Sequence, residues 1–242
     1  VVVFMRHASA ACNVYGGDPT INSIGEDQVA DRMSDPNLAK MLSADPEESA
    51  QVILMSPMVR TMHTALLAFR QRLPKAKWEL DADLIELGGI GMIVSAAGEA
   101  ILSKFSADEL LEQYLVLEKV AERARTTRDD PRHHHHHHNH SHGGVELQRR
   151  EGLDSERAME AESAAESSAE DLVGPELDDR FARFTERVWN RPEKRFIAVS
   201  HKHILKEGIG VPLDQTQTVI MALSEHGWRR LEPTQCWPGF HL

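Results

Sequence analysis

The sequence has little cysteine, few aromatic residues and no long apolar run. Its 242 residues contain two cysteines, Cys12 and Cys236, which lie far apart in the chain. This content argues against a disulfide framework and for a reducing compartment. No apolar segment approaches membrane-spanning length, and no signal-peptide pattern is present. We therefore expect a cytoplasmic protein with no membrane partner.

The chain also lacks an excess of basic residues. It has 27 Lys and Arg against 38 Asp and Glu, a formal net charge of -11. Because sequence-independent binding of nucleic acid needs a basic surface, we do not expect nucleic acid as a partner. A small anionic substrate is compatible with this balance, since charges more than about 8 Å away are screened at physiological salt.

One stretch has almost no large apolar side chains, whereas the rest can form a core. With 41% hydrophobic residues, the chain can bury one sizeable core, so we expect a single domain over residues 1–242. From 126 to about 174 the composition is acidic, basic, Ser, Ala and His, which predicts a disordered insert. Its polyhistidine tract, starting at His133, lacks the fixed geometry of a metal site. We expect no metal and no cofactor.

Three apolar runs are each followed by cationic or potentially cationic side chains. Residues 1–5 precede Arg6 and His7, residues 51–55 precede Ser56 and Arg60, and residues 196–199 precede Ser200 and His201. Buried parallel strands would bring these groups together at one sheet edge, where ligands bind in open α/β sheets. Phosphate suits such a cluster, and helices starting after Ser9 and Pro57 would add N–H donors.

The remaining patterns predict the elements that complete the fold. A helix over 25–41 is expected, capped by Asn22 or Ser23, with a break at Asp35-Pro36. Further helices are expected over 58–72, 110–125 (after a capping box at 106–109) and 177–189, and strands over 77–80, 217–223 and 228–231. Glycines at 88–91 and 96–98 predict an irregular loop. The fold class is therefore α/β, a three-layer α/β/α sandwich with a mostly parallel central sheet.

Taken together, the motifs of this chain resemble those of the histidine phosphatase superfamily, also called phosphoglycerate mutase-like. They cover most of the chain outside the insert and are, in order, Arg6-His7 with Asn13 six residues later, Asn22 to Gln28, Ser56-Pro57-x-x-Arg60-Thr61-x-x-Thr64-Ala65, Leu84-Ile85-Glu86 and Ser200-His201. The chain departs from the family's pattern in three places: Ala8 and Lys202 stand where glycine is usual, and residues 214–217 differ from an Asn-x-Glu-like pattern.

The resemblance implies a role for each matching residue. His7 would be the nucleophile and carry a phosphohistidine. Glu86 would be the proton donor to the leaving group, with Asp81 and Asp83 as competitors. The phosphate oxygens would be held by Arg6, Asn13, Arg60 and His201, the last also counted as catalytic.

The implied function is hydrolysis of a small phosphorylated substrate, a phosphomonoester. A mutase-type phosphotransferase and a catalytically silent interaction protein are the alternatives. We expect Ser56 and Ser200 to fix the loops at the strand ends. His63 is expected to lie on an ordinary helix surface.

Overall fold

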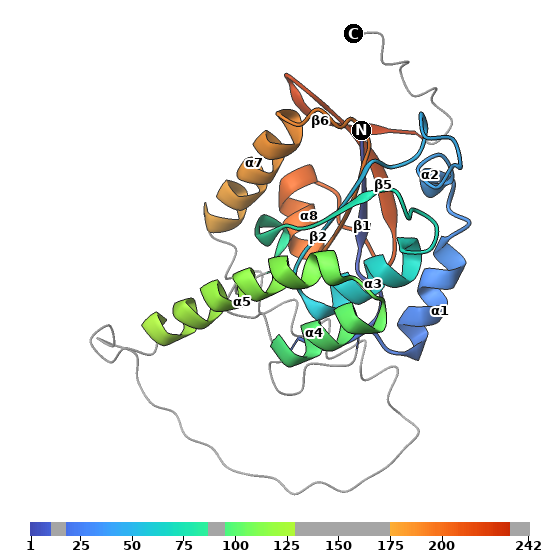
Figure 1. Ribbon diagram of the computed structural model, residues 1–242. Coiled ribbons are helices and arrows are strands. Elements are labelled where there is room, and N and C mark those ends of the chain that lie inside the picture. The colour runs from blue at the N-terminus through green and yellow to red at the C-terminus, as the bar shows by residue number, and fades with distance from the viewer. Residues whose placement is uncertain (11–17, 87–94, 129–174, 233–242) are drawn as a thin grey trace, which may run out of the picture.

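The computed structural model describes residues 1–10, 18–86, 95–128 and 175–232. In this part the chain forms a six-stranded mixed sheet with helices on both faces (Figure 1). The predicted α/β sandwich is thus confirmed. The elements in chain order are β1 (Val2–Arg6), α1 (Ser23–Arg32), α2 (Pro36–Ala39), β2 (Val52–Met55), α3 (Val59–Phe69), β3 (Lys77–Leu80), the 3-10 helix η1 (Ala82–Leu84), α4 (Ser95–Lys104), α5 (Asp108–Arg128), α7 (Pro175–Trp189), β4 (Phe196–Ser200), α8 (Lys202–Ile209), β5 (Thr218–Ser224) and β6 (Gly227–Leu231).

The sheet has the strand order β3-β2-β4-β1-β5-β6. Strands β3, β2, β4 and β1 are mutually parallel, β5 is antiparallel to β1, and β6 is antiparallel to β5. Strand β1 therefore lies inside the sheet, hydrogen-bonded on both sides. All five of its residues are buried, as its continuous apolar run predicts.

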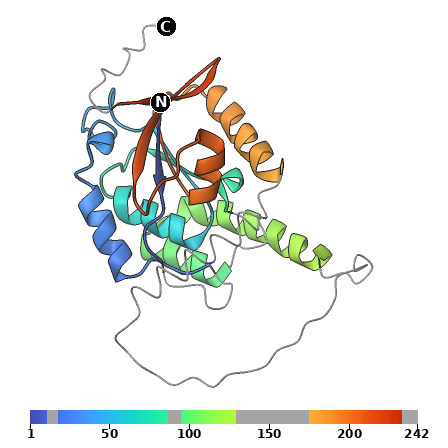
Figure 2. The ribbon, with the colours of Figure 1, turned by 180° about the vertical axis from the view of Figure 1, so that it is seen from behind.

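The sheet separates two apolar layers. Alternate residues of β1 point to opposite faces, so Val3 and Met5 pack in the layer of α1 to α5, whereas Val2 and Phe4 pack against α7 and α8. Figure 2 shows α7 and α8 together on one side of the sheet. With both faces covered, a ligand would reach this sheet at the ends of its strands, and in open α/β sheets it binds outside the carboxyl ends of the parallel strands.

The helix predicted over 25–41 is divided into two at the expected break. Helix α1 starts after Asn22, whose side-chain oxygen accepts a hydrogen bond from the Gly25 N–H at 2.9 Å. Helix α2 starts after Asp35, which caps the Asn37 N–H at 2.7 Å, with Pro36 in the first turn. Both caps follow the usual chemistry of helix starts.

One expectation about a helix start is wrong, and another lies outside the described residues. A helix after Ser9 would run over residues 11–17, which are not described; Ala10, just before them, forms a β-bridge with Ile21. The capping box at 106–109 does not form as expected: α5 starts at Asp108, and the Glu109 carboxylate accepts a hydrogen bond from the Arg70 guanidinium.

Tertiary packing overrides two other local patterns. Residues 96–98, expected in a loop, lie in α4. A Cβ on Gly98 would lie 2.1 Å from the Tyr114 ring, so this glycine permits α4 and α5 to pack closely. Trp189, expected in the buried stripe of its helix, is 51% exposed at the end of α7, whereas Phe181 and Phe184 are buried.

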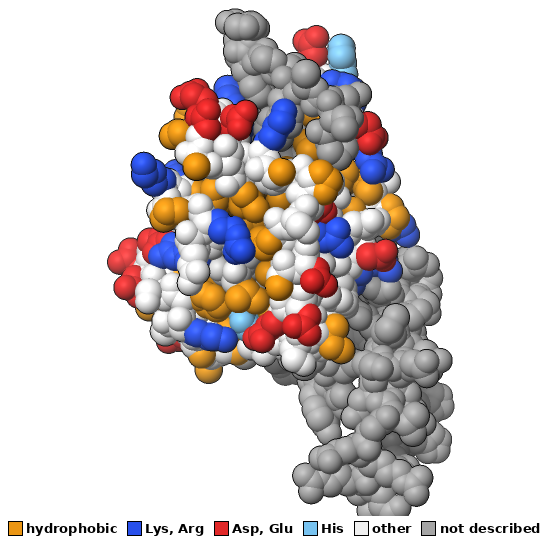
Figure 3. Space-filling model, turned by 90° about the vertical axis from the view of Figure 1, so that its right-hand side faces the viewer, with side chains coloured by type: hydrophobic (Ala, Val, Ile, Leu, Met, Phe, Trp, Pro, Cys, Tyr) orange, Lys and Arg blue, Asp and Glu red, His pale blue; other side chains and the backbone are white. Residues whose placement is uncertain are grey.

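Several expectations concern residues outside the described part of the chain. They involve Cys12, Asn13, the glycines at 88–91, the polyhistidine tract and Cys236. Helix α5 continues to Arg128, so the first three residues of the expected insert are helical. None of the described helices is long and apolar enough to cross a membrane. On the described atoms of the face in Figure 3, acidic, basic and apolar side chains are interspersed.

Candidate active site

The carboxyl ends of β1, β2 and β4 bring the predicted site residues together. In the sheet register Arg6 lies opposite Ser200, and Met5 and Met55 both lie opposite Val199. The His7 N–H then donates to the Ser200 carbonyl at 3.0 Å, and the rings of His7 and His201 lie 5.2 Å apart between centroids. Both imidazoles are buried.

His7 is held as a neutral imidazole with a defined tautomer. Its Nδ1 lies 2.8 Å from the Ala8 carbonyl oxygen, which can only accept, so Nδ1 carries the proton. The Nε2 lone pair is then available to a substrate. Burial, followed by the charges of Arg60 and Arg6, holds the pKa of His7 well below its ordinary value. A nucleophilic imidazole needs this neutral form.

His201 is oriented by one of its two ring nitrogens. Its Nε2 lies 2.9 Å from Ser56 Oγ, while its Nδ1 is buried with no hydrogen-bond partner in the described part of the chain. Burial and then Arg60 lower the pKa of His201 well below its ordinary value. The unpartnered nitrogen beside His7 is a position where a substrate oxygen would restore a hydrogen bond.

The two serines at the strand ends hold loops, as expected. Ser56 Oγ accepts from the Met58 N–H at 3.4 Å, in the turn that leads into α3, in addition to its contact with His201. Ser200 Oγ donates to the Leu84 carbonyl at 2.8 Å, which ties the end of β4 to η1.

Arg60 is buried near both histidines, and a carboxylate that sequence reasoning missed holds it there. Asp18 Oδ1 lies 3.2 Å from Arg60 Nη1, and Asp18 Oδ2 accepts the Val59 N–H at 2.5 Å. Burial raises the pKa of Asp18 to about 6, against the opposing effects of Arg60 and the Val59 N–H. The sequence around Asp18 indicated only a loop.

Arg6 and the Asn22 to Gln28 run link three segments around the site. Arg6 Nη1 donates to the Leu213 carbonyl at 3.4 Å, so the loop before β5 folds over the end of β1. The Gln28 side chain accepts from the Ser9 N–H at 2.8 Å and donates to Gln215 at 3.0 Å. The residues from Asn22 to Gln28 therefore hold the segments around the site in place by hydrogen bonds.

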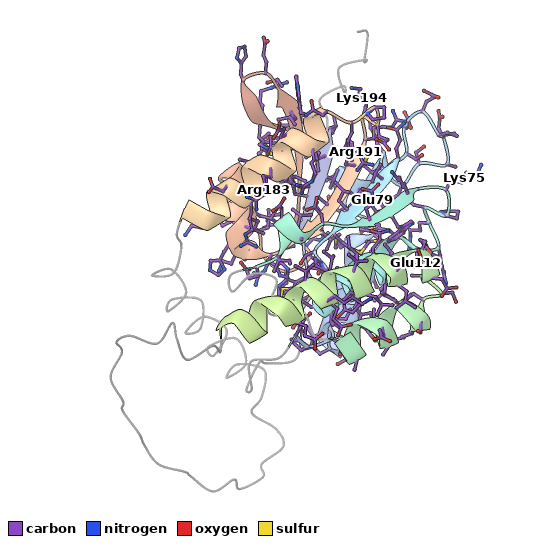
Figure 4. All side chains as sticks on the ribbon, turned by 60° about the vertical axis from the view of Figure 1, so that its left-hand side comes forward. Lys75, Glu79, Glu112, Arg183, Arg191 and Lys194 are labelled. Carbon is purple, nitrogen blue, oxygen red and sulfur yellow. The ribbon has the colours of Figure 1, made fainter. Side chains whose placement is uncertain are left out.

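Two of the three candidate acids, Asp81 and Asp83, form ion pairs with arginines of α7. Asp83 pairs with Arg183 at 2.7 Å and with Arg187 at 2.5 Å, and Arg187 also reaches Asp81 at 2.6 Å. Farther along, Arg191 pairs with Glu79 at 2.6 Å (Figure 4). These contacts fix β3 and η1 against α7 and leave Asp81 and Asp83 in structural roles.

Glu86 follows η1 and approaches the first turn of α8 instead. Its Oε2 lies 3.4 Å from Nδ1 of His203, two residues after His201. Arg180 on α7 donates to the Ile85 carbonyl at 2.8 Å. Neither His203 nor Arg180 was singled out from the sequence. The spacing of His203 from His201 was the one available signal.

The expectation for His63 is wrong. It was expected on a helix surface, but it is buried with its ring against Phe105, at 5.7 Å between centroids.

A groove of about 620 Å³ lies between α7, α8 and the β5–β6 hairpin, and neither His7 nor His201 lines it. Its charged lining residues are Glu186, Glu207 and Glu225, which would repel phosphate.

The site is therefore a buried group of cations and neutral imidazoles, with the Asp18 carboxyl paired with Arg60 and the Glu86 carboxyl near His203. Guanidinium groups suit phosphate oxygens, and the neutral His7 can supply an electron pair to phosphorus. Within the described ranges, no three His, Cys, Asp or Glu side chains are grouped as a metal would require. Asn13 lies outside these ranges, so its predicted contact stays a prediction.

No family model and no curated protein matches the sequence. Among solved structures, the chain is similar to a candidate alpha-ribazole-5'-P phosphatase from Escherichia coli, with 15% identity, a TM-score of 0.48, and 95% of this chain and 93% of that chain covered. It is also similar to a phosphoserine phosphatase from Entamoeba histolytica, with 12% identity, a TM-score of 0.46, and 96% and 94% covered. A mycobacterial glucosyl-3-phosphoglycerate phosphatase gives 11% identity, a TM-score of 0.44, and 95% of each chain covered. At such low identities, an activity has to be argued from the residues of the site.

Proposed function

We propose that this chain is a phosphatase of the histidine phosphatase superfamily, which hydrolyses small phosphomonoesters through a phosphohistidine on His7. The observation that carries the proposal is the neutral, buried His7 at the end of β1, with Nδ1 bound to the Ala8 carbonyl and Arg6, Arg60 and His201 around it. We place the enzyme in the cytoplasm on its cysteine content.

The proposed reaction has two displacements. His7 Nε2 attacks phosphorus as the bond to the leaving oxygen breaks, and Glu86 in its acid form protonates that oxygen. Water, deprotonated by the same carboxylate, then attacks the phosphohistidine and releases phosphate and neutral His7. Arg6, Arg60 and His201 stabilise the charge that develops on the phosphoryl oxygens in both steps.

The first prediction tests the nucleophile. Incubation with radiolabelled nitrophenyl phosphate and rapid quenching should give an acid-labile, base-stable phosphoprotein, and His7→Ala should abolish both the label and turnover. Ala removes only the attacking nitrogen and its ring, so the fold should be kept, as circular dichroism would check. A matched control is His226→Ala, because His226 is exposed in the turn between β5 and β6. Full turnover by His7→Ala would overturn the proposal.

The same experiment addresses the alternatives. A silent interaction protein would give neither label nor turnover in the wild type. A mutase-type enzyme would return the label to a second hydroxyl when an acceptor such as a phosphoglycerate is added. A hydrolase releases it as inorganic phosphate.

A further inference from the structure

Glu86 has a titratable neighbour that the proposed two-step reaction does not use. His203 Nδ1 lies 3.4 Å from Glu86 Oε2, and the two side chains are only 10% and 15% exposed. This distance is long for a hydrogen bond. Catalytic contacts of this kind are often long without substrate and shorten in the complex.

The backbone before Glu86 is fixed next to His203 from two sides. Ser200 Oγ donates to the Leu84 carbonyl and Arg180 Nη1 donates to the Ile85 carbonyl, both at 2.8 Å. The first bond comes from the end of β4 and the second from α7. Because consecutive carbonyls are held in this way, the backbone that carries Glu86 has a fixed position next to the start of α8.

On the elements packed against this pair, the buried or half-buried cations are Arg6 at the end of β1, Arg180 on α7 and Lys202 beside His203 on α8, while Asp83 on η1 is neutralised by Arg183 and Arg187. The other charged groups described on these helices, Asp179 and Glu186 on α7 and Lys206 and Glu207 on α8, are exposed, so solvent screens them. The cations and the start of α8 oppose a positive imidazole. A bound phosphate dianion reverses this balance. The pair should therefore take up a proton as substrate binds.

We infer that His203 is a positioning residue that shares one proton with Glu86 and so supplies the general acid, an inference that rests on the proposed function. As the P–O bond breaks, its electron pair passes to the leaving oxygen. The one shared proton moves from His203 Nδ1 to the Glu86 carboxylate and on to that oxygen, which leaves Glu86 as a carboxylate and His203 as a neutral imidazole. In the second step the attacking water gives its proton back to the pair, which restores the starting state.

The test compares pH profiles of kcat for β-glycerophosphate, whose leaving group needs protonation, between the wild type and His203→Asn. The Asn amide keeps a hydrogen-bond donor near the position of Nδ1 but cannot hold the shared proton. The alkaline limb, which is the part of the profile where kcat falls as pH rises, should move to lower pH by about one unit or more in His203→Asn. It should move toward the ordinary glutamic acid pKa of about 4.3. Nitrophenyl phosphate should change much less, because its leaving group departs without a proton.

Matched controls separate this inference from the proposed function. His226→Asn alters an exposed histidine 3.5 Å from Glu225 and should leave the limb in place. An unchanged or upward-shifted limb in His203→Asn, with turnover and the phosphoprotein intact, would overturn the role of His203 alone. Absence of the phosphoprotein in the wild type would instead overturn the proposed function.

A second measurement does not depend on turnover. The imidazole NMR signal of His203, assigned by its loss in His203→Asn or His203→Gln, is titrated in the wild type and in Glu86→Gln with inorganic phosphate bound. The pKa of His203 should be higher in the wild type, because the carboxylate stabilises the imidazolium. Equal values in the two proteins would overturn the inference.

Discussion

Asp18 is a buried carboxylate inside a cationic site, and its protonation affects stability. Burial raises its pKa to about 6 in the folded chain, whereas an unfolded aspartate has a pKa of about 3.9. Between these values the folded state binds more protons than the unfolded state. The free energy of unfolding therefore falls as pH rises from about 4 to about 6, and this contribution is at most roughly 3 kcal/mol.

Asp18→Asn should remove this pH dependence. The amide oxygen can still accept from the Val59 N–H, but the residue no longer titrates, so the wild type should lose stability relative to the variant between pH 4.5 and pH 7. The ion pair with Arg60 is already included in the pKa of Asp18, so the remaining difference between the neutral carboxyl and the amide adds an offset that does not vary with pH. Urea unfolding at pH 4.5, 5.5 and 7 measures the difference. Parallel curves for the two proteins would contradict the assigned pKa.

At the scale of single residues, the sequence predicted the site residues that directly follow strands. It missed those whose partners lie far away in the sequence. His7 and His201 could be placed because each comes directly after an apolar run whose end defines the sheet edge. Asp18 could not, because its partner Arg60 lies 42 residues away and the local Gly-Gly-Asp-Pro sequence suits a turn. Arg180 lies 95 residues from the carbonyl it holds.

At the scale of elements, α1 packs closely on the segment that leaves β1. A Cβ on Gly25 would lie 2.2 Å from the Ser9 carbonyl oxygen, and the Asn22 N–H donates to that oxygen at 3.1 Å. Since Ser9 is two residues after His7, the position of α1 is coupled to that of the nucleophile.

Gly25→Ala should therefore lower both stability and turnover. The backbone must shift to admit the methyl group, which costs typically 1–3 kcal/mol for an overpacked site. Thermal unfolding and nitrophenyl phosphate turnover measure the two effects. Glu26→Ala, at the neighbouring exposed position of α1, is the matched control and should change stability by no more than about 0.5 kcal/mol. Equal behaviour of the two variants would show that α1 can move freely.

The type of an element could be predicted wherever its apolar residues kept a regular spacing over the whole element. The apolar stripe of α3, with Met62, Ala65 and Phe69, is buried as expected. Helix α4 was missed because Gly98 reads locally as a loop residue, whereas its function is to accommodate the Tyr114 ring of α5. The difference lies in contacts between helices, which a local pattern does not contain.

At the scale of the whole molecule, we propose that residues 129–174 are dispensable for fold and catalysis. Their composition cannot provide a packed core. Figure 1 shows the end of α5 and the start of α7 on the same side of the molecule. A Gly/Ser linker of about 20 residues, with an r.m.s. span of about 25 Å, should then connect Arg128 to Pro175.

The linker variant should keep the melting temperature of the wild type within a few degrees and its turnover within about twofold, because every residue of the two described apolar layers is retained. Differential scanning calorimetry and a nitrophenyl phosphate assay measure these quantities. A second variant that lacks only residues 133–142 separates the effect of the histidines from that of length. A large fall in melting temperature for the linker variant alone would show that the remainder of the segment packs.

The interior position of β1 also determines when the proposed site can be complete during synthesis. Strand β1 ends at Arg6, and its parallel neighbour β4 begins only at Phe196. Ribosomes add roughly 5–20 residues per second, so the apolar residues of β1 wait about 10–40 s for this partner. Until then β1 lacks both of its partner strands, β4 and β5, and an unpaired apolar strand is prone to aggregation. The proposed site can be complete only after His201 has emerged.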